Sequence, residues 1–315
     1  MQVIYDIEHL SANQKTALLA RQSVATIGFF DGVHQGHAYL LHQLKAEADR
    51  RNMQTMVVTF SVHPRKVLTP AQTPLLLTSP QEKTALLDAL GIDVCVMLPF
   101  TPEFSQLTSQ EFLQLYLSER LHVGCLLVGY DHHFGRGSDG DFATYRKEGE
   151  ACGIDVVRAD EWTQAHSPAS SSAIRTLLLS GQVSEATRLL GHPYQLSGHI
   201  IKGRGVGHLL GYPTANLKPD TADKLLPKAG AYAAKALLGG QAYPAMVYIG
   251  RRPTFDDSHA LTIEAHLIGA QGQFYGQNMT LLFVDHLRDD QTFASADALR
   301  AQLDSDVEHA KRILL

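Results

Sequence analysis

The feature that most constrains the fold of this chain is a change in the pattern of its expected elements near residue 190. Strand and helix candidates alternate before Gly191-His192-Pro193, whereas strand candidates follow one another without long helices after it. A chain of 315 residues is long enough for two domains that each bury a core. We therefore predict one domain over residues 1–190 and a second over residues 191–315.

The first part has the rhythm of an α/β domain. Apolar strands that alternate with amphipathic helices are typical of a parallel sheet covered by helices, with ligands at the carboxyl ends of the strands. The expected strands are residues 24–27, 55–60, 94–98, 125–128 and 154–157, and the expected helices are residues 37–50, 81–90, 109–121, 141–151, 173–180 and 182–190.

The second part predicts an antiparallel barrel or sandwich, because glycine-rich or polar turns separate its successive strands. One helix, over residues 295–314, is expected to close the chain. The expected strands are residues 195–201, 231–238, 243–249, 261–268 and 279–285.

The stretch from Gly28 to His37 joins the first expected strand to the first expected helix. A strand, a glycine turn and a helix start form a natural anion site, because the first helical turn leaves backbone N–H groups unpaired. His34 and His37 lie three residues apart, so both imidazoles can reach one ligand from one side and bind phosphoryl oxygens. The competing interpretations are a tight turn with solvent-exposed histidines, and a zinc site with only Asp31 nearby as a further ligand.

Two more segments carry polar groups after expected strands. Residues 59–65, Thr-Phe-Ser-Val-His-Pro-Arg, follow the second strand, and they could equally be a strand stopped by proline with its polar groups in solvent. Residues 129–137 form a loop after a buried strand. A metal-binding pair at His132 and His133 is disfavoured there, because adjacent side chains of an extended segment point apart.

Residues 170–175, Ser-Ser-Ser-Ala-Ile-Arg, predict a helix start. Serine at a helix N-terminus has an ordinary role as a cap. The same geometry presents hydroxyls, N–H donors and Arg175 to an anion, so capping and phosphate binding are compatible.

Taken in order, these segments resemble the adenylyltransferase module of the bifunctional bacterial riboflavin kinase/FAD synthetases. The resemblance includes His-x-Gly-His at 34–37, Pro-Leu-Leu-Leu-Thr at 74–78 with Glu82-Lys83, Gly-Tyr-Asp-x-x-Phe-Gly at 129–135, and the serine-rich helix start. It implies a Rossmann-like nucleotidylyltransferase domain that joins FMN to the AMP part of ATP. The implied residues are His34 and His37 for catalysis; Gly28, Phe29, Asp31, Gly36, Ser171, Ser172 and Arg175 for ATP; and His63, Pro64, Asp131 and Phe134 for the flavin or adenine pocket.

The second part begins with a glycine-rich stretch over residues 203–216. Backbone exposed by glycine can wrap a polyphosphate closely, and Thr214 and Asn216 supply oxygen ligands suited to Mg²⁺. A flexible hairpin is the competing interpretation, and no helix follows that would make the stretch a Rossmann fingerprint.

Pro-Thr-Ala-Asn at the end of that stretch resembles the signature of riboflavin kinases, and residues 226–232, 249–255 and 263–267 support the resemblance. The resemblance implies that Glu264 accepts the proton of the riboflavin 5′-hydroxyl, a role that suits a carboxylate beside a metal-bound γ-phosphate. Periodicity alone would place Glu264 on the polar face of a strand. The other implied residues are Gly203, Gly205, Gly207, Gly211, Thr214 and Asn216 for ATP, the last two also for Mg²⁺, and Arg288 with Phe293 for the flavin.

The chain departs from the family pattern at a few positions. Ser61-Val62 stand where the family usually has Glu-Pro, and Tyr248 stands where it often has Asn. Ser172-Ala173 and Gly269-Ala270 are further departures. None of them removes the two histidines, the arginine or the glutamate that the resemblance assigns to phosphate chemistry.

The ordered motifs predict a bifunctional enzyme of flavin synthesis. Its kinase half would convert riboflavin and ATP, with Mg²⁺, into FMN and ADP, and its other half would convert FMN and ATP into FAD and pyrophosphate. The competing hypotheses are an enzyme with one active half, and a flavin-binding carrier without turnover. The presence of two phosphate sites counts against the carrier.

Composition and charge limit the partners and the cellular locations that the sequence favours. The net charge of −5 and the lack of a lysine or arginine run disfavour a nucleic-acid or membrane partner. No apolar run approaches the ~18 residues that span a bilayer, and the N-terminus lacks a signal-peptide core. Three cysteines are too few for a disulfide framework, and Cys95 and Cys125 lie in apolar runs that predict buried thiols. We therefore predict a cytoplasmic protein.

Overall fold

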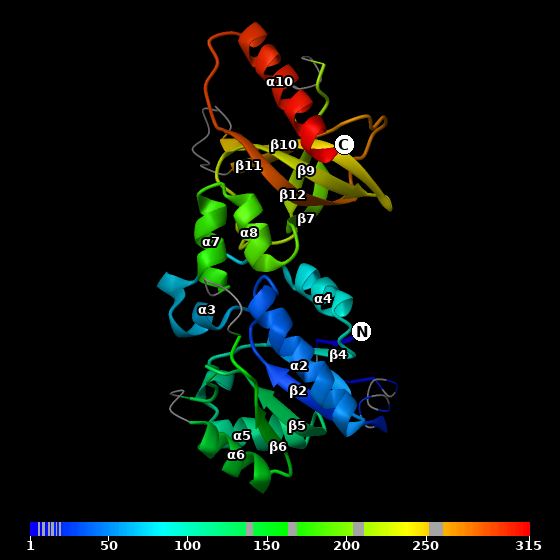
Figure 1. Cartoon of the computed structure of the whole chain (residues 1–315). Helices are drawn as coiled ribbons and strands as arrows, with labels where there is room; N and C mark the ends of the chain where they lie inside the picture. The colour runs from blue at the N-terminus through cyan, green and yellow to red at the C-terminus, as the bar shows by residue number, and fades with distance from the viewer. Residues whose placement is uncertain are drawn as a thin grey trace. The chain divides into compact units, whose positions relative to one another are not determined.

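The computed structural model describes residues 1–5, 7, 10, 11, 13, 16, 18, 20–136, 141–162, 169–203, 211–251 and 261–315. They form two compact units, drawn in Figure 1. Unit 1 comprises Met1–Pro74 and Lys83–Pro168, and unit 2 comprises Leu75–Glu82 and Ala169–Leu315. The functional division at residue 190 is a separate question and stays a prediction.

Unit 1 is built on a six-stranded sheet with the order β1-β4-β3-β2-β5-β6, in which every pair is parallel. The predicted parallel α/β fold is thereby confirmed. The short first strand was not predicted, because three residues show no periodicity. The strands are β1 Gln2–Ile4, β2 Ser23–Ile27, β3 Gln54–Phe60, β4 Val94–Leu98, β5 Val123–Val128 and β6 Asp155–Arg158.

Helices cover both faces of this sheet, which explains why its strands are uninterrupted apolar runs. Leu41 packs in one core cluster with Val24, whereas Phe112 packs in the other cluster with Ala25. Val24 and Ala25 are neighbours on β2 and point to opposite faces. The helices are α2 Gln35–Arg51, α3 Pro64–Leu68, α4 Pro80–Ala89, α5 Ser109–Phe112 and α6 Phe142–Ala151, with a π-helical turn at Leu113–Ser118 and 3₁₀ turns at Pro70–Gln72 and Phe104–Gln106.

Two expected helices differ from the observed ones. α2 begins at Gln35 rather than at residue 37, because His34 already serves as its N-cap. The helix expected over residues 109–121 is the short α5 followed by the π-helical turn, which ends at Ser118. Periodicity does not distinguish these two helix types over so few turns.

The strand order places the glycine turn at an edge suited to ligands. β2 pairs with β3 on one side and with β5 on the other, so the order of strands reverses between β2 and β5. Ligands of open α/β sheets bind at such a point, outside the carboxyl ends of the strands. The turn after Ile27 and the loop after Val128 therefore share one edge of the sheet, as predicted.

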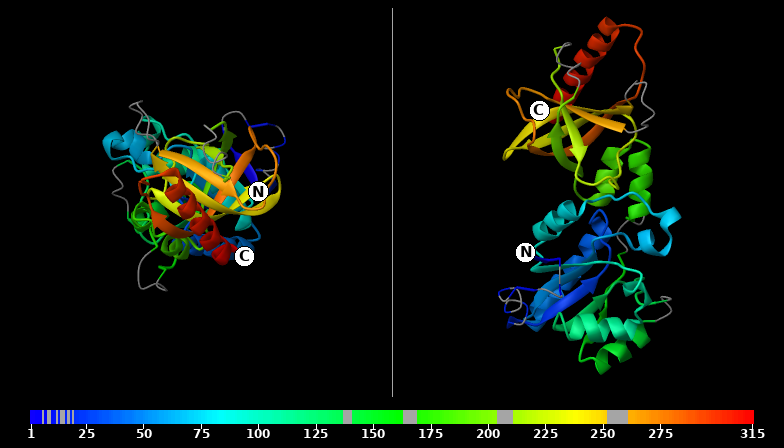
Figure 2. Two further views of the ribbon diagram at one scale, coloured as in Figure 1. Left: turned by 90° about the horizontal axis from the view of Figure 1, so that it is seen from above. Right: turned by 180° about the vertical axis from the view of Figure 1, so that it is seen from behind.

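Unit 2 is a closed antiparallel barrel with the order β10-β11-β8-β7-β12-β9, seen from further sides in Figure 2. The predicted barrel is confirmed. β8 was not predicted as a strand, because the glycines and proline before it favour a loop. The elements are α7 Ser171–Leu179, α8 Val183–Leu190, β7 Tyr194–Ile201, β8 Ala215–Pro219, β9 Gly230–Leu238, β10 Gln241–Arg251, β11 Leu261–Leu267, β12 Asn278–Asp289 and α10 Ala296–Leu314.

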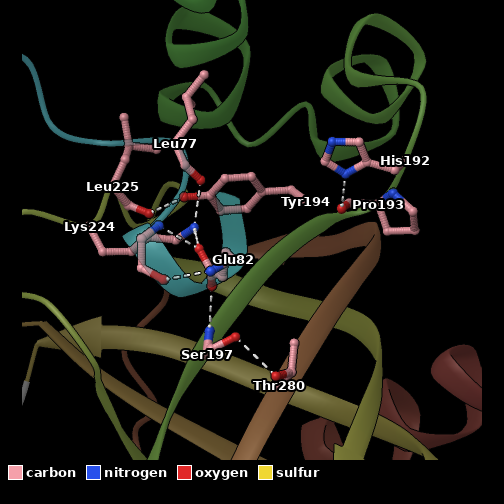
Figure 3. A network of polar contacts seen from close by, with 10 residues as sticks. Leu77, Glu82, His192, Pro193, Tyr194, Ser197, Lys224, Leu225 and Thr280 are labelled. Atoms are coloured by element: carbon pink, nitrogen blue, oxygen red, sulfur yellow. Dashed lines mark hydrogen bonds and ion pairs between the residues drawn. The ribbon is translucent and has the colours of Figure 1, made fainter. Parts of the chain in front are cut away.

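The segment Leu75–Glu82 is bound into unit 2 by buried polar contacts (Figure 3). Leu225 N donates to Leu76 O at 2.8 Å. Lys224 Nζ and Glu82 Oε2 form an ion pair at 2.5 Å, with both side chains almost fully buried. A segment that precedes the barrel strands by more than a hundred residues therefore contributes to the interior of unit 2.

Candidate active sites

The turn that follows β2 has an uncommon backbone conformation. Phe30, Gly32 and Val33 have φ angles of 53°, 81° and 40°, in the left-handed region that costs a non-glycine residue about 1–2 kcal/mol. A Cβ on Gly28 would lie 2.9 Å from the Phe30 ring, so only glycine leaves room for that ring. Phe30 and Val33 are each 2% exposed and Asp31 is 3% exposed. Apolar burial thus offsets the cost of a strained turn at the ligand-binding edge.

The two histidines lie side by side at the start of α2. His34 Nδ1 accepts a hydrogen bond from His37 N at 3.4 Å, and His34 O accepts the first helical bond from Ala38 N at 2.9 Å. The imidazole rings are stacked, with centroids 3.7 Å apart. Gly36 lies between them in the first helical turn. The rings therefore share one side of the helix start, as their spacing predicts.

His37 is held in its neutral form. Burial lowers its pKa well below the usual value, and His34, Lys83 and His132 lower it further by charge repulsion. Its Nδ1 is buried without a hydrogen-bond partner in the described part of the chain. A neutral imidazole has one N–H donor, which can bind a phosphoryl oxygen without adding a full charge to the site.

The end of β3 approaches the same turn. The His63 ring lies 4.6 Å from the Phe29 ring, and His63 Nδ1 accepts from Arg65 N at 3.1 Å to cap α3, whose first residue is Pro64. Lys83 Nζ donates to Phe29 O at 2.7 Å. Sequence reasoning gave Lys83 no role, although its place in the Glu-Lys motif was a signal.

The loop after β5 contributes side chains of two kinds. Asp131 is exposed, whereas Phe134 is 8% exposed and stacks on Tyr145 with ring centroids 4.2 Å apart. Phe134 N also donates to Tyr145 Oη at 3.1 Å. Phe134 thus packs in the core of unit 1, and its part in a flavin pocket stays a prediction.

The serine-rich helix start forms α7 of unit 2. Ser170 is the N-cap, and its Oγ accepts from a backbone N–H of the first turn at 3.2 Å. Ser171 and Ser172 are the first two helical residues. Arg175 Nε donates to Leu75 O at 2.8 Å. The capping interpretation therefore holds for Ser170, and the phosphate-binding role of the other three residues stays a prediction.

A second group of predicted residues meets on neighbouring strands of the barrel. Thr214 Oγ1 donates to Glu264 Oε2 at 3.2 Å. Asn216 of β8 is the direct antiparallel partner of Glu264 on β11, so their side chains share one face of the sheet. A Cβ on Gly203 would lie 2.1 Å from Asn216 Nδ2, so glycine is required where the chain passes this amide.

The structure describes some of the other residues predicted for the kinase half. Gly211 has a φ of 87°, which glycine adopts without strain. Arg288 Nε donates to Asp306 Oδ2 at 2.9 Å, and its guanidinium lies 5.6 Å from the centre of the Phe293 ring. The predicted residues outside the described part of the chain are Gly205 and Gly207.

Tyr248 is a residue near Glu264 to which sequence reasoning gave no role. The two are direct partners across β10 and β11. Tyr248 Oη donates to Asp290 Oδ1 at 2.7 Å, and burial followed by this bond raises the pKa of the phenol. The departure of this position from the family pattern was the available signal.

Comparison with known proteins identifies a family for each half of the chain. A family model described as FAD synthetase matches residues 17–173, and one described as riboflavin kinase matches residues 190–314. The chain is 32% identical over 312 residues to the bifunctional riboflavin kinase/FMN adenylyltransferase of Listeria monocytogenes, which covers 99% of this chain and 98% of that protein. The chain belongs to this bifunctional family.

A second member of the bifunctional family, from Escherichia coli K12, is 35% identical over 284 residues and covers 90% of each chain. A solved structure described as a macrolide-efflux protein from Streptococcus pneumoniae has a TM-score of 0.83 and 29% identity, with 98% of both chains covered. Within the described residues, no helix combines the length and the apolar character that crossing a bilayer requires.

Membership of the bifunctional riboflavin kinase/FMN adenylyltransferases establishes the two activities. The chain phosphorylates riboflavin to FMN and adenylylates FMN to FAD. The predicted function is therefore confirmed, and flavins and ATP follow as its substrates.

Proposed function

We propose that Thr214, Asn216 and Glu264 carry out the phosphorylation of riboflavin. The proposal rests chiefly on the cross-strand pairing of Asn216 with Glu264 and on the 3.2 Å bond from Thr214 Oγ1 to the carboxylate. Glu264 accepts the proton of the 5′-hydroxyl as the hydroxyl oxygen bonds to the γ-phosphorus and the bond to ADP breaks. A positioned general base contributes about 10²–10⁴-fold to such a step.

The same residues fit a magnesium ion. The Thr214 hydroxyl and the Asn216 amide oxygen are hard oxygen donors of the kind that Mg²⁺ prefers. The backbone of Gly203 passes so close to the Asn216 amide that a side chain there would displace it, so this glycine keeps the amide in place. Thr214 and Asn216 would hold the ion, and a bound Mg²⁺ would neutralise charge on the β- and γ-phosphates.

The turn after β2 is assigned to adenylyl transfer. An oxygen of the FMN phosphate bonds to the α-phosphorus of ATP as the bond from that phosphorus to pyrophosphate breaks. His34 and His37 donate hydrogen bonds to phosphoryl oxygens on which charge develops, which is the role of preorganised donors. The backbone that shapes this site is supplied by Gly28, Phe29, Asp31 and Gly36.

The remaining contacts follow the family resemblance. Ser171, Ser172 and Arg175 would bind ATP phosphates. The contact between the His63 and Phe29 rings supports a place for His63 beside the turn after β2. The flavin-binding residues proposed from the resemblance are His63, Pro64, Asp131 and Phe134 in the adenylyltransferase half and Arg288 in the kinase half.

Two single variants test the division of labour. Glu264→Ala should lower FMN formation from riboflavin about 10²–10⁴-fold and leave FAD formation from FMN unchanged. His37→Ala should do the reverse, with a loss of about 10²–10³-fold. Each variant is the control for the other, with both reactions followed by chromatography of the flavins. Loss of both activities in either variant, or of neither, would contradict the assignment.

A further inference from the structure

Lys83 ties together the ends of two neighbouring strands beneath the turn after β2. The residue is 2% exposed. Its Nζ donates to Phe29 O at 2.7 Å, just beyond β2, and to Phe60 O at 3.4 Å, the last residue of β3. A third bond, to Thr59 Oγ1 at 3.3 Å, also reaches β3. One ammonium group thus fixes both segments that carry predicted ligand-binding side chains.

The charge of Lys83 is accommodated mainly by neutral groups. Besides the three oxygens, Nζ faces the Phe29 ring, whose centre is 3.9 Å away. The ionisable groups that act on Lys83 are Asp31 and Cys95, and both raise its pKa. Burial outweighs them and lowers the pKa to about 8. The Cys95 thiol, with its own pKa raised by burial to about 11, is uncharged at that pH.

The positive charge of Lys83 produces an electrostatic field at the turn after β2. A lysine in contact with a carboxylate is largely neutralised at short range, whereas one bound by carbonyl and hydroxyl oxygens retains its net charge. The effect is already visible at His37, where Lys83 is among the groups that lower the pKa. A triphosphate is a polyanion, and a fixed positive charge in a buried site stabilises it more than the same charge in water.

We propose that Lys83 is a positioning residue for adenylyl transfer, which shapes the turn after β2 and places a fixed positive charge beside the triphosphate. This inference rests on the assignment of that turn to ATP. Lys83 acts through Phe29 and through the strand ends that it holds, so the proposal does not require it to touch the reacting atoms.

The experiment compares Lys83→Met and Lys83→Arg with the wild type in the full-length chain. Lys83→Met should lower kcat/KM for ATP in FAD formation by about 10–100-fold. The variant would misplace the residues of the turn and remove a fixed charge, and both changes reduce the stabilisation of the transition state. Lys83→Arg should recover part of this loss. FMN formation from riboflavin, measured on the same samples, should stay within about twofold of the wild type and shows that unit 2 is folded. The fluorescence of Trp162, which should match that of the wild type, shows that unit 1 is folded.

A pH profile separates this role from a merely structural one. In the wild type, kcat/KM for ATP in FAD formation should fall above about pH 8 as Lys83 loses its proton. This alkaline decline should be absent in Lys83→Arg, because guanidinium stays protonated. Lys45→Met is the matched control: Lys45 Nζ donates to Leu90 O at 3.0 Å in the same unit, and its removal should leave the profile unchanged.

The outcomes distinguish the proposal from the assignment on which it rests. If the wild type forms FAD but Lys83→Met matches its rate, or if Lys83→Arg keeps the decline near pH 8, the role of Lys83 is refuted. If Lys83→Met does not fold, the profile of Lys83→Arg decides. If His37→Ala forms FAD as fast as the wild type, the assignment of the turn fails instead.

Discussion

Two buried lysines, one in each unit, are accommodated in different ways. Lys224 in unit 2 pairs with Glu82 at 2.5 Å and also donates to Leu77 O at 2.5 Å. Lys83 in unit 1 is bound by three neutral oxygens and a phenyl face. Both residues are less than 5% exposed, at 4% and 2%. Burial alone therefore does not explain the choice of partners.

The different partners suit the two lysines to different roles: the ion pair of Lys224 joins two segments, whereas the charge of Lys83 can act on a ligand. A buried ion pair is neutral as a whole and cannot attract a ligand of either sign, but it fixes the segments that carry its two members. Glu82 also accepts from Ser197 N at 2.8 Å, so its carboxylate connects the segment Leu75–Glu82 to β7 (Figure 3). The charge of Lys83, left without a contacting carboxylate in its described bonds, is suited to a polyanionic substrate.

The largest expected effect is on the stability of unit 2. Lys224→Met leaves the buried Glu82 charge uncompensated and should lower the free energy of unfolding by about 3–5 kcal/mol. The Glu82→Gln/Lys224→Met double variant should be more stable than Lys224→Met, because the charge is removed with its partner. The measurement is the urea concentration that halves FMN formation. A single variant as stable as the wild type would show that the ion pair does not stabilise unit 2.

The second effect is a pH dependence of the stability of unit 1. The pKa of Lys83 is lowered from 10.5 to about 8 on folding, so between these values the unfolded chain binds more protons than the folded chain. The free energy of unfolding should therefore rise with pH across this window. Between pH 7.5 and pH 10 the rise in the wild type relative to Lys83→Met should be about 2.4 kcal/mol.

Urea unfolding at pH 7.5 and pH 10, followed by the fluorescence of Trp162, measures this difference, since the chain has one tryptophan and it lies in unit 1. Taking the difference between wild type and Lys83→Met cancels the groups that titrate equally in both. A difference that is constant or falls with pH would mean that the Lys83 pKa is not lowered on folding.

Much of this comparison could not be derived from the sequence. Strand runs and glycine turns predicted the sheet, the barrel and the side-by-side placement of His34 and His37, because these depend on local periodicity and spacing. The partners of Lys83 and Lys224 depend on contacts between distant segments. Consecutive residues, Glu82 and Lys83, serve different units, and no local pattern indicates this.

The candidate sites show the same limit. Glu264 and Asn216 are far apart in the sequence, and only the register of β8 against β11 makes them direct partners. The family resemblance supplied both residues without their geometry. The register of β10 against β11 makes Tyr248 a direct partner of Glu264, and nothing in the local sequence of Tyr248 indicates this.

The smallest effect tests whether the phenyl face stabilises the Lys83 charge. Phe29→Leu removes the ring but keeps the backbone carbonyl that accepts from Nζ at 2.7 Å. A buried cation–π contact contributes about 0.5–2 kcal/mol, so its loss should lower the Lys83 pKa by roughly one unit. The alkaline decline of FAD formation should then move to lower pH. Phe29→Tyr, which keeps an aromatic face, should leave the decline near pH 8, and a Phe29→Leu profile that coincides with the wild type would assign the stabilisation to the oxygens alone.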